Sequence, residues 1–134
     1  MDNNNMDNNN MSNNKGYTLI EMLTVIAIMG ILASIAVPGF QRSIVRSKEA
    51  SLRNSLFVLR DVIDQYYGDF GEYPESLEIL VEKRYIREVP MDPFTGATDT
   101  WILIPPEGEE VTGVYDIHSG SNKISLYSGP YNEW

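Results

Sequence analysis

The amino-acid sequence predicts an α+β fold, in which a long N-terminal helix packs on a small C-terminal antiparallel sheet. Residues 22–40 are 19 positions without a charge, which is the length of a membrane helix. From residue 52 to residue 70, apolar residues recur at steps of four and three, the spacing of an amphipathic helix. Beyond residue 100, short apolar runs alternate with glycines, as in short strands joined by turns.

Composition limits the function before any motif is considered. The chain has 134 residues, the size of one domain. Lys and Arg total 10 against 19 for Asp and Glu, so the net charge is -9. We expect no nucleic-acid partner, because such binding needs a basic face to replace the phosphate counterions. The chain has no Cys and one His, which excludes a disulfide, a thiolate nucleophile and a His-pair metal site.

Residues 1–14, MDNNNMDNNNMSNN, are predicted to be disordered, because eight of the fourteen are Asn and there is no apolar face to bury. Met1, Met6 and Met11 are candidate alternative translation starts. A start at Met11 leaves Lys15 as the only charge between Met11 and Gly16, whereas a start at Met1 adds two aspartates. Positive flanks hold the cytoplasmic end of a membrane helix, so we favour Met11.

The uncharged stretch at 22–40 has three interpretations. As a helix it spans ~28 Å, close to the ~30 Å hydrocarbon thickness of a bilayer. A buried core helix is disfavoured, because this domain is too small to surround a helix that is apolar on every face. A cleaved secretory signal also fits poorly, because its apolar region is usually ~7–15 residues long. We therefore predict a retained membrane helix.

Two residues of this segment are chemically unusual. An ionised carboxylate inside a bilayer costs ~2.5–3.5 kcal/mol, so Glu21 is expected to have a partner. The alternative is that Glu21 lies at the interface and is hydrated. Pro38 lacks a backbone donor and weakens the helix near its far end, although prolines are common in membrane helices.

Residues 41–70 are predicted to continue as an amphipathic helix. Its apolar stripe comprises Leu52, Leu56, Leu59, Ile63, Tyr66 and Phe70. Most of the basic residues lie off the stripe and are expected to form a solvated face: Arg42, Arg46, Lys48, Arg53 and Arg60. The segment 68–71, Gly-Asp-Phe-Gly, is expected to end the helix.

The C-terminal part is predicted to contain short elements. We expect a short helix from Ser76 to Tyr85, and turns at Asp92-Pro93 and Thr95-Gly96. Three strands are expected to form the small antiparallel sheet, namely Trp101–Ile104, Val114–His118 and Ile124–Tyr127.

No catalytic constellation accompanies these elements. The sequence has no Gly-rich phosphate loop and no nucleophile elbow. His118 alone is weak evidence for catalysis and is expected to be structural. We therefore expect no enzyme, and a membrane-anchored enzyme is the alternative from another class.

The segment Lys15–Glu21, KGYTLIE, followed at once by the uncharged stretch, resembles the class III signal of type IV pilins and pseudopilins. The resemblance implies that prepilin peptidase cuts between Gly16 and Tyr17 and methylates the new amino terminus at Tyr17, where Phe is more usual. It also implies roles in assembly for Glu21 and Pro38. The Glu21 carboxylate of one subunit would neutralise the Tyr17 ammonium of its neighbour, because either charge is costly when left alone.

Four further motifs, taken in order, resemble the major pseudopilin of type II secretion systems, general secretion pathway protein G. They are Tyr-Pro at 73–74, Leu-x-x-Leu at 77–80, Pro-Met-Asp-Pro-Phe-Thr-Gly at 90–96 and Tyr-Asp-Ile at 115–117. The missing Cys pair agrees, because many type IV pilus subunits close a C-terminal loop with a disulfide. The resemblance implies a pilin-like fold with a cleaved leader at 1–16, a membrane and filament-core helix at 17–40 and a periplasmic domain at 41–134.

The same resemblance implies a location and partners. The mature subunit would cross the inner membrane once, with its C-terminal domain in the periplasm. Its partners would be prepilin peptidase, further copies of itself, minor pseudopilins and the inner-membrane assembly platform. The helices would bundle into a short periplasmic filament that pushes folded cargo through an outer-membrane channel. A major or minor type IV pilus subunit is the alternative.

The pseudopilin family commonly binds calcium in the loop after its last strands. The family's two acidic ligands fall on Asn122 and Glu133 of this chain. Calcium needs six to eight oxygens, and Asn122 lacks the expected charge while Lys123 adds an unfavourable one. The alternative is a loop held in place by its Ser and Asn residues and by the packing of Trp134.

Overall fold

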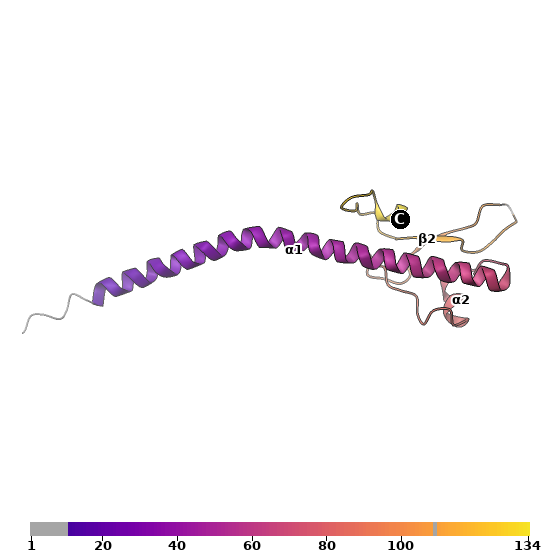
Figure 1. Ribbon diagram of the computed structural model, residues 1–134, viewed down its shortest axis with the longest axis horizontal. Coiled ribbons are helices and arrows are strands. Elements are labelled where there is room, and N and C mark those ends of the chain that lie inside the picture. Colours follow the sequence, from indigo (N-terminus) through magenta and orange to yellow (C-terminus); the bar gives the residue numbers. More distant parts are fainter. Residues whose placement is uncertain (1–10, 109) are drawn as a thin grey trace, which may run out of the picture. The chain divides into compact units, whose positions relative to one another are not determined.

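The structure, a computed structural model, describes residues 11–108 and 110–134, with side chains from residue 17 onward. The elements in chain order are helix α1 (Met11–Phe70), helix α2 (Leu77–Glu82), strand β1 (Ile102–Ile104), strand β2 (Asp116–His118) and a 3-10 helix η1 (Tyr131–Glu133) (Figure 1). One long helix followed by a small antiparallel sheet confirms the predicted α+β, pilin-like layout. The chain divides into two compact units, one reaching to Arg42 and the other spanning Ser43–Trp134.

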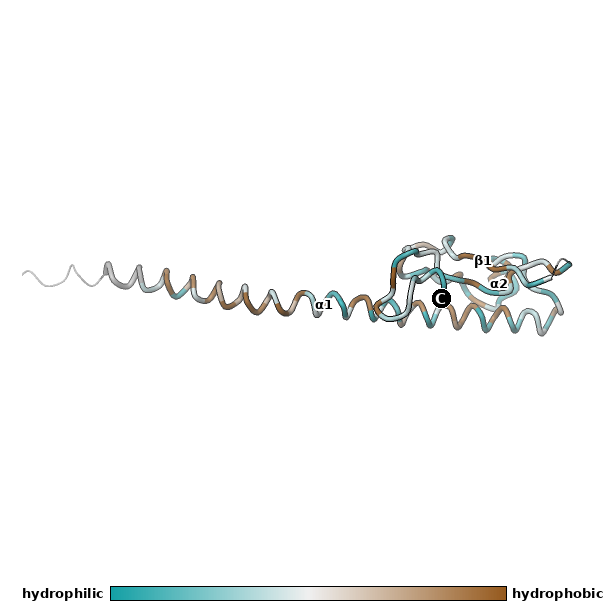
Figure 2. The backbone as a smooth tube through the Cα atoms, turned by 90° about the horizontal axis from the view of Figure 1, so that it is seen from above, coloured by the Kyte–Doolittle hydropathy of each residue, from teal (hydrophilic) through white to brown (hydrophobic). Residues whose placement is uncertain are grey.

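The first unit is the N-terminal part of α1. Every side chain from Tyr17 to Phe40 is exposed, and the tube through this segment is largely brown in Figure 2. By length and composition, α1 can cross a membrane. Residues 11–14 are helical, so their predicted disorder is wrong. Adding residues to a helix that already exists costs far less than nucleating one, which allows a poor helix sequence to extend it. Residues 1–10 lie outside the described part.

The second unit begins on the amphipathic part of α1. The predicted stripe is buried except at its last residue, Phe70, which is 48% exposed. Val62, which was not in the predicted stripe, is buried as well. The helix ends at Phe70, as predicted. Gly71 has a φ of +71° and its N–H bonds to the Tyr67 carbonyl at 2.8 Å. A left-handed glycine is the usual way to stop a helix and satisfy one of its last carbonyls.

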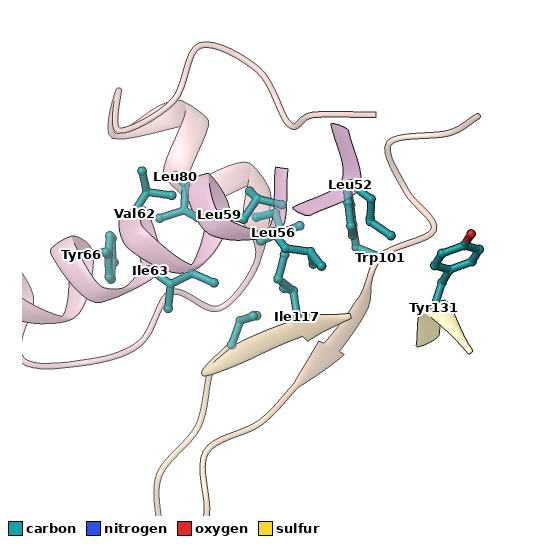
Figure 3. Packing of buried hydrophobic residues seen from close by; sticks show 12 residues of the cluster. Leu52, Leu56, Leu59, Val62, Ile63, Tyr66, Leu80, Trp101, Ile117 and Tyr131 are labelled. Carbon is teal, nitrogen blue, oxygen red and sulfur yellow. The ribbon is translucent and has the colours of Figure 1, made fainter. Parts of the chain in front are cut away.

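The core of this unit joins α1 to the elements that follow it. Figure 3 shows Leu56, Leu59 and Ile63 of α1 beside Ile117 of β2 and Leu80 of α2. Leu59, Ile63, Leu80 and Ile117 are completely buried. Burying each such side chain stabilises the fold by about 1.5–3 kcal/mol. The helix expected at 76–85 is shorter, because its backbone leaves the helical path after Glu82 and Arg84 takes a positive φ of 64°.

The sheet contains two strands in the described part of the chain. β1 and β2 pair antiparallel, with Ile102 opposite His118 and Ile104 opposite Asp116. The prediction of a third strand at 124–127 is wrong, because Ile124 makes only an isolated bridge to Pro130. Proline has no N–H for a ladder, so the chain there closes as a loop.

Candidate functional site

The predicted processing and assembly residues lie on one stretch of α1. Tyr17 is 74% exposed, and Glu21 follows four residues later on the same side of the helix. Glu21 is exposed and makes no hydrogen bond or ion pair with any described residue. Its carboxylate is therefore free to pair with a cation from another molecule. Cleavage after Gly16 and methylation of Tyr17 stay predictions.

The surroundings of Glu21 are apolar. From Tyr17 to Phe40 it is the only acidic or basic residue. Two hydroxyls of this segment bond within the helix, Thr24 to the Ile20 carbonyl at 2.8 Å and Ser34 to the Ile31 carbonyl at 2.7 Å. Hydroxyls that bond to their own helix cost little in an apolar medium, whereas the carboxylate keeps its full need for a partner.

A second site fixes the C-terminal segment to one flank of α1 through a buried carboxylate. Glu49 is 6% exposed and accepts the Leu126 N–H at 2.9 Å and the Tyr131 hydroxyl at 2.8 Å. Burial and the hydrogen bond to Glu49 raise the pKa of Tyr131 to about 12. Tyr131 therefore keeps the proton that it donates at neutral pH.

Three arginines on the same flank also contact this part of the chain. Arg60 donates to Asp116 Oδ1 at 2.6 Å, to the Ile117 carbonyl at 3.0 Å and to the Trp134 carbonyl at 2.5 Å. The Arg53 guanidinium lies 4.7 Å from the centre of the Trp134 ring.

Arg46 completes the set by donating to the Tyr127 hydroxyl at 2.8 Å. The expectation of a solvated basic face is wrong for Arg60, which is half-buried, whereas Arg46 and Arg53 are exposed as expected and also contact the C-terminal segment. Their seven-residue spacing, which places all three on one side of a helix, was the available signal in the sequence.

His118 belongs to the same set of structural contacts. Its Nδ1 lies 2.9 Å from the Asn132 carbonyl oxygen, and its Nε2 lies 3.6 Å from Asp116 Oδ2. These contacts tie β2 to η1. No nucleophile is within hydrogen-bond distance of the ring among the described residues.

A third polar centre organises the loop at 90–96. Asp92 is completely buried, and its Oδ1 accepts the Phe94 N–H at 2.9 Å while its Oδ2 accepts the Ser119 hydroxyl at 2.6 Å and the Gly120 N–H at 3.1 Å. The sequence predicted the turn but not the burial. Gly120 has no room for a side chain, because an added Cβ would meet the Thr100 carbonyl oxygen at 2.0 Å.

The residues predicted to bind calcium do not form a complete ligand set. Asn122 and Glu133 are both exposed, and no three acidic or histidine side chains gather into a metal site among the described residues. One nearby oxygen, Asn132 Oδ1, is buried without a hydrogen bond in the described part. One buried amide oxygen and two exposed groups fall short of the six to eight oxygens that calcium takes. Calcium binding stays a prediction, and no step of the function below depends on it.

Comparison with known proteins links the N-terminal part to a described motif. Residues 11–37 match the family described as the prokaryotic N-terminal methylation motif. The match covers the predicted cleavage site, Glu21 and most of the uncharged stretch. No solved structure matches the chain significantly.

The relatives extend the similarity into the folded unit. The chain is 31% identical over 121 residues to the type II secretion system core protein G of Escherichia coli (strain K12), covering 78% of this chain and 79% of that protein. It is 37% identical over 122 residues to the type IV major pilin protein PilE1 of Neisseria gonorrhoeae, covering 85% and 68%. It is 43% identical over 80 residues to the fimbrial protein EcpC of Eikenella corrodens, covering 56% of this chain and about half, 52%, of that protein.

Proposed function

The chain belongs to the type IV pilin and pseudopilin family, and from that premise we propose that it is the major pseudopilin of a type II secretion system. Prepilin peptidase would remove residues 1–16 and methylate Tyr17. The mature subunit would be anchored in the inner membrane by residues 17–40, with residues 41–134 in the periplasm. Copies would then polymerise, with minor pseudopilins and the inner-membrane assembly platform, into a filament that drives secretion. The role is structural and not enzymatic.

The observation that supports this proposal most is an apolar helix without a partner of its own. From Tyr17 to Phe40, no side chain of α1 is buried by the described chain. Large apolar surfaces on soluble proteins are usually covered by a partner or a membrane. A subunit that leaves the membrane to enter a filament would have this surface covered in both places, by lipid before assembly and by the helices of other copies afterwards.

Glu21 would set the register of those helices. Cleavage before Tyr17 creates an α-amino group with a reference pKa of ~7.7–8.0, which is largely cationic at neutral pH. In a filament core, this ammonium would pair with the Glu21 carboxylate of a neighbouring subunit. A pair of charges in an apolar medium is strongly directional, and leaving one member alone is costly. Only one axial offset between neighbouring copies then satisfies both groups.

A type IV pilus subunit is the second candidate. The identity of 37% to a type IV major pilin favours it. Against it, the chain has no Cys for a C-terminal disulfide, and it covers more of core protein G, 79%, than of that pilin, 68%. Deletion of the gene separates the two functions. Loss of secreted proteins from the medium supports the pseudopilin, and loss of surface fibres with normal secretion supports the pilin.

Two variants of the full chain test processing and assembly in its host. Gly16→Val should leave an uncleaved precursor in the membrane, because the side chain blocks access to the scissile carbonyl. Glu21→Ala should be cleaved and inserted, since removing a charge makes insertion cheaper, but it should form no filaments and support no secretion. Mass spectrometry of the N terminus, filament yield and secreted protein are the measurements.

Thr24→Ala is the matched control, because it changes a polar side chain of the same helix within one turn of Glu21. It should be processed, assembled and secretion-competent. Mature protein beginning at Tyr17 from Gly16→Val would refute the cleavage site. Wild-type filament yield from Glu21→Ala would mean that the carboxylate is only hydrated at the interface.

A further inference from the structure

A groove runs along α1 next to the C-terminal residue of the described chain. Its volume is about 320 Å³, and Leu56, Phe57 and Trp134 form its apolar floor. Phe57 is 70% exposed, which is unusual for a phenylalanine in the folded unit. The rim is charged. Arg60 is already paired with Asp116, and Arg53 stacks on Trp134.

The acidic side of the rim has carboxylate oxygens that could accept further hydrogen bonds or pair with a cation. Asp61 and Asp64 both line the groove. Asp61 accepts a hydrogen bond only from Gln65 in the described part, at 2.8 Å, and Asp64 makes no hydrogen bond or ion pair there. An apolar floor beside free carboxylates matches a segment that carries exposed apolar side chains and one positive charge.

This chain presents such a segment in the loop at 123–127. Ile124 is 79% exposed and Tyr127 is 74% exposed. Lys123 is the only acidic or basic residue between positions 119 and 132 of the sequence. Its ammonium makes no ion pair among the described residues. The loop is also held firmly, because the Leu126 N–H bonds to Glu49. A preformed loop loses less entropy on docking than a flexible one.

The loop and the groove lie along the same flank of α1 within the folded unit. The loop contacts Arg46 and Glu49, whereas the groove centres on Phe57 and Arg60. About ten residues of helix separate them, which is roughly 15 Å at 1.5 Å per residue. A second copy whose helix axis runs in the same direction can bring its loop to the first copy's groove by a rotation about that axis, which turns the two flanks toward each other, together with an axial shift of about that distance. A common orientation is what insertion into one membrane requires.

We propose that the groove around Phe57 binds the loop 123–127 of the next subunit, with Lys123 facing Asp61 and Asp64. This inference rests on the proposed function and names the contact between folded units that would add to the helix bundle. The two surfaces differ, so the contact is heterologous and does not close on itself. Repetition of such a contact generates an open filament and not a closed dimer.

Cysteine cross-linking tests the contact directly, because the chain contains no Cys. Two copies are expressed together at full length, a tagged copy with Asp61→Cys and an untagged copy with Ile124→Cys. Phe57, Asp64 and Lys123 are left intact. Under mild oxidation of assembled filaments, we expect a disulfide-linked dimer whose mass equals one tagged plus one untagged copy. Each copy has a single Cys, so no link within one chain can form.

The matched control moves the second cysteine to Leu103, which is 43% exposed on β1 and outside the loop. This pair should give little mixed dimer. Charge reversal supplies an independent test. Lys123→Asp and Asp64→Lys should each lower filament yield, and the double variant should restore it, because like charges facing each other repel and the swapped pair attracts. Asp64 and Lys123 are exposed, so the variants should fold.

The outcomes separate this inference from the proposed function. Wild-type chains that form filaments while the Asp61 and Ile124 cysteines give no more mixed dimer than the control would overturn the groove contact and leave the pseudopilin function standing. A cross-link from Asp61→Cys to a different protein would also overturn it. Absence of filaments from wild-type chains in the secreting host would reject the proposed function itself.

Discussion

The two parts of α1 obey the same helical geometry but differ in what covers their apolar side chains. Up to Arg42, apolar residues occupy all sides of the helix and remain exposed, for example Leu23 at 59% and Ile35 at 72%. From Ser43 onward one stripe of apolar residues is buried, with Leu59 at 0% exposed, while a few others such as Phe57 at 70% lie off the stripe. The stripe is covered by the strands and loops of its own chain. The first part needs lipid or other copies.

The difference divides the apolar residues of a single helix into those buried within the chain and those left exposed by it. The stripe of the second part stabilises the folded unit, because its burial is completed within the chain. Under the proposed function, the apolar surface of the first part would serve membrane insertion and assembly, because its burial requires other molecules. Substitutions in the two parts should therefore affect different measurements.

Leu59→Ala should give the largest loss of stability. Truncating a fully buried leucine typically costs about 2–5 kcal/mol of unfolding free energy, through lost burial and the cavity left behind. Both tryptophans, Trp101 and Trp134, lie in the folded unit, so tryptophan fluorescence of the full chain in detergent follows its unfolding. Leu23→Ala is the matched control and should leave this transition unchanged. Equal losses for both variants would contradict the division of roles.

The carboxylates of the two units should behave differently too. Asp92→Asn replaces one of the two carboxylate oxygens by an NH₂ group, which cannot accept a hydrogen bond. Depending on how the amide is turned, either the Phe94 N–H or the Ser119 hydroxyl and the Gly120 N–H then lose their acceptor. We expect a loss of about 2–3 kcal/mol in the same fluorescence assay. Glu21→Gln should leave the transition unchanged, because Glu21 has no partner among the described residues. An unchanged free energy of unfolding for Asp92→Asn would mean that the buried network contributes little to stability.

The smallest expected effect is a pH dependence of the folded unit. Burial and the bond to Glu49 raise the pKa of Tyr131 from 10.0 to about 12. The folded chain then holds this proton more tightly than the unfolded chain, so its contribution is constant below pH 10 and is lost as the pH rises toward 12. A hydrogen bond to Asp69, together with burial, likewise raises the pKa of Tyr85 to about 12.

Tyr131→Phe should therefore reduce, but not abolish, the fall in unfolding free energy between pH 10 and 12. Urea unfolding at a series of pH values in this range measures the slope. A slope identical to that of the wild-type chain would mean that Tyr131 titrates at its ordinary value.

Periodicity explains why the helix and its core were predictable. The uncharged run and the apolar stripe are local patterns. They predict the membrane-spanning and amphipathic parts of α1 without knowledge of the fold. The end of α1 was predictable for a similar reason, because Gly71 supplies a left-handed residue. The turn at Asp92 follows from its short side chain, which bonds to backbone N–H groups two or three residues later.

Contacts between distant segments were not predictable in this way. Glu49 and Tyr131 are 82 residues apart, and Arg60 and Asp116 are 56 apart. Charged residues on a helix flank usually point into water, so nothing local indicated that Glu49 is buried, and the spacing of the arginines indicated a shared side of the helix but not their partners. The prediction of a strand at 124–127 was wrong for the same reason, namely contacts with distant residues. Its alternation of residues suits a strand, but the long-range bond to Glu49 and the bridge at Pro130 make it a loop.

Pro38 has a mechanical consequence for a subunit under axial load. It lies inside α1, and its missing N–H removes the bond that would hold it to the Ser34 carbonyl. When a helix is pulled, the turn with the fewest hydrogen bonds opens first. Each residue that leaves the helix extends the chain by about 2 Å, from 1.5 Å to roughly 3.3 Å per residue. A single opened turn near Pro38 would therefore let the subunit lengthen by several ångströms while the folded unit keeps its structure.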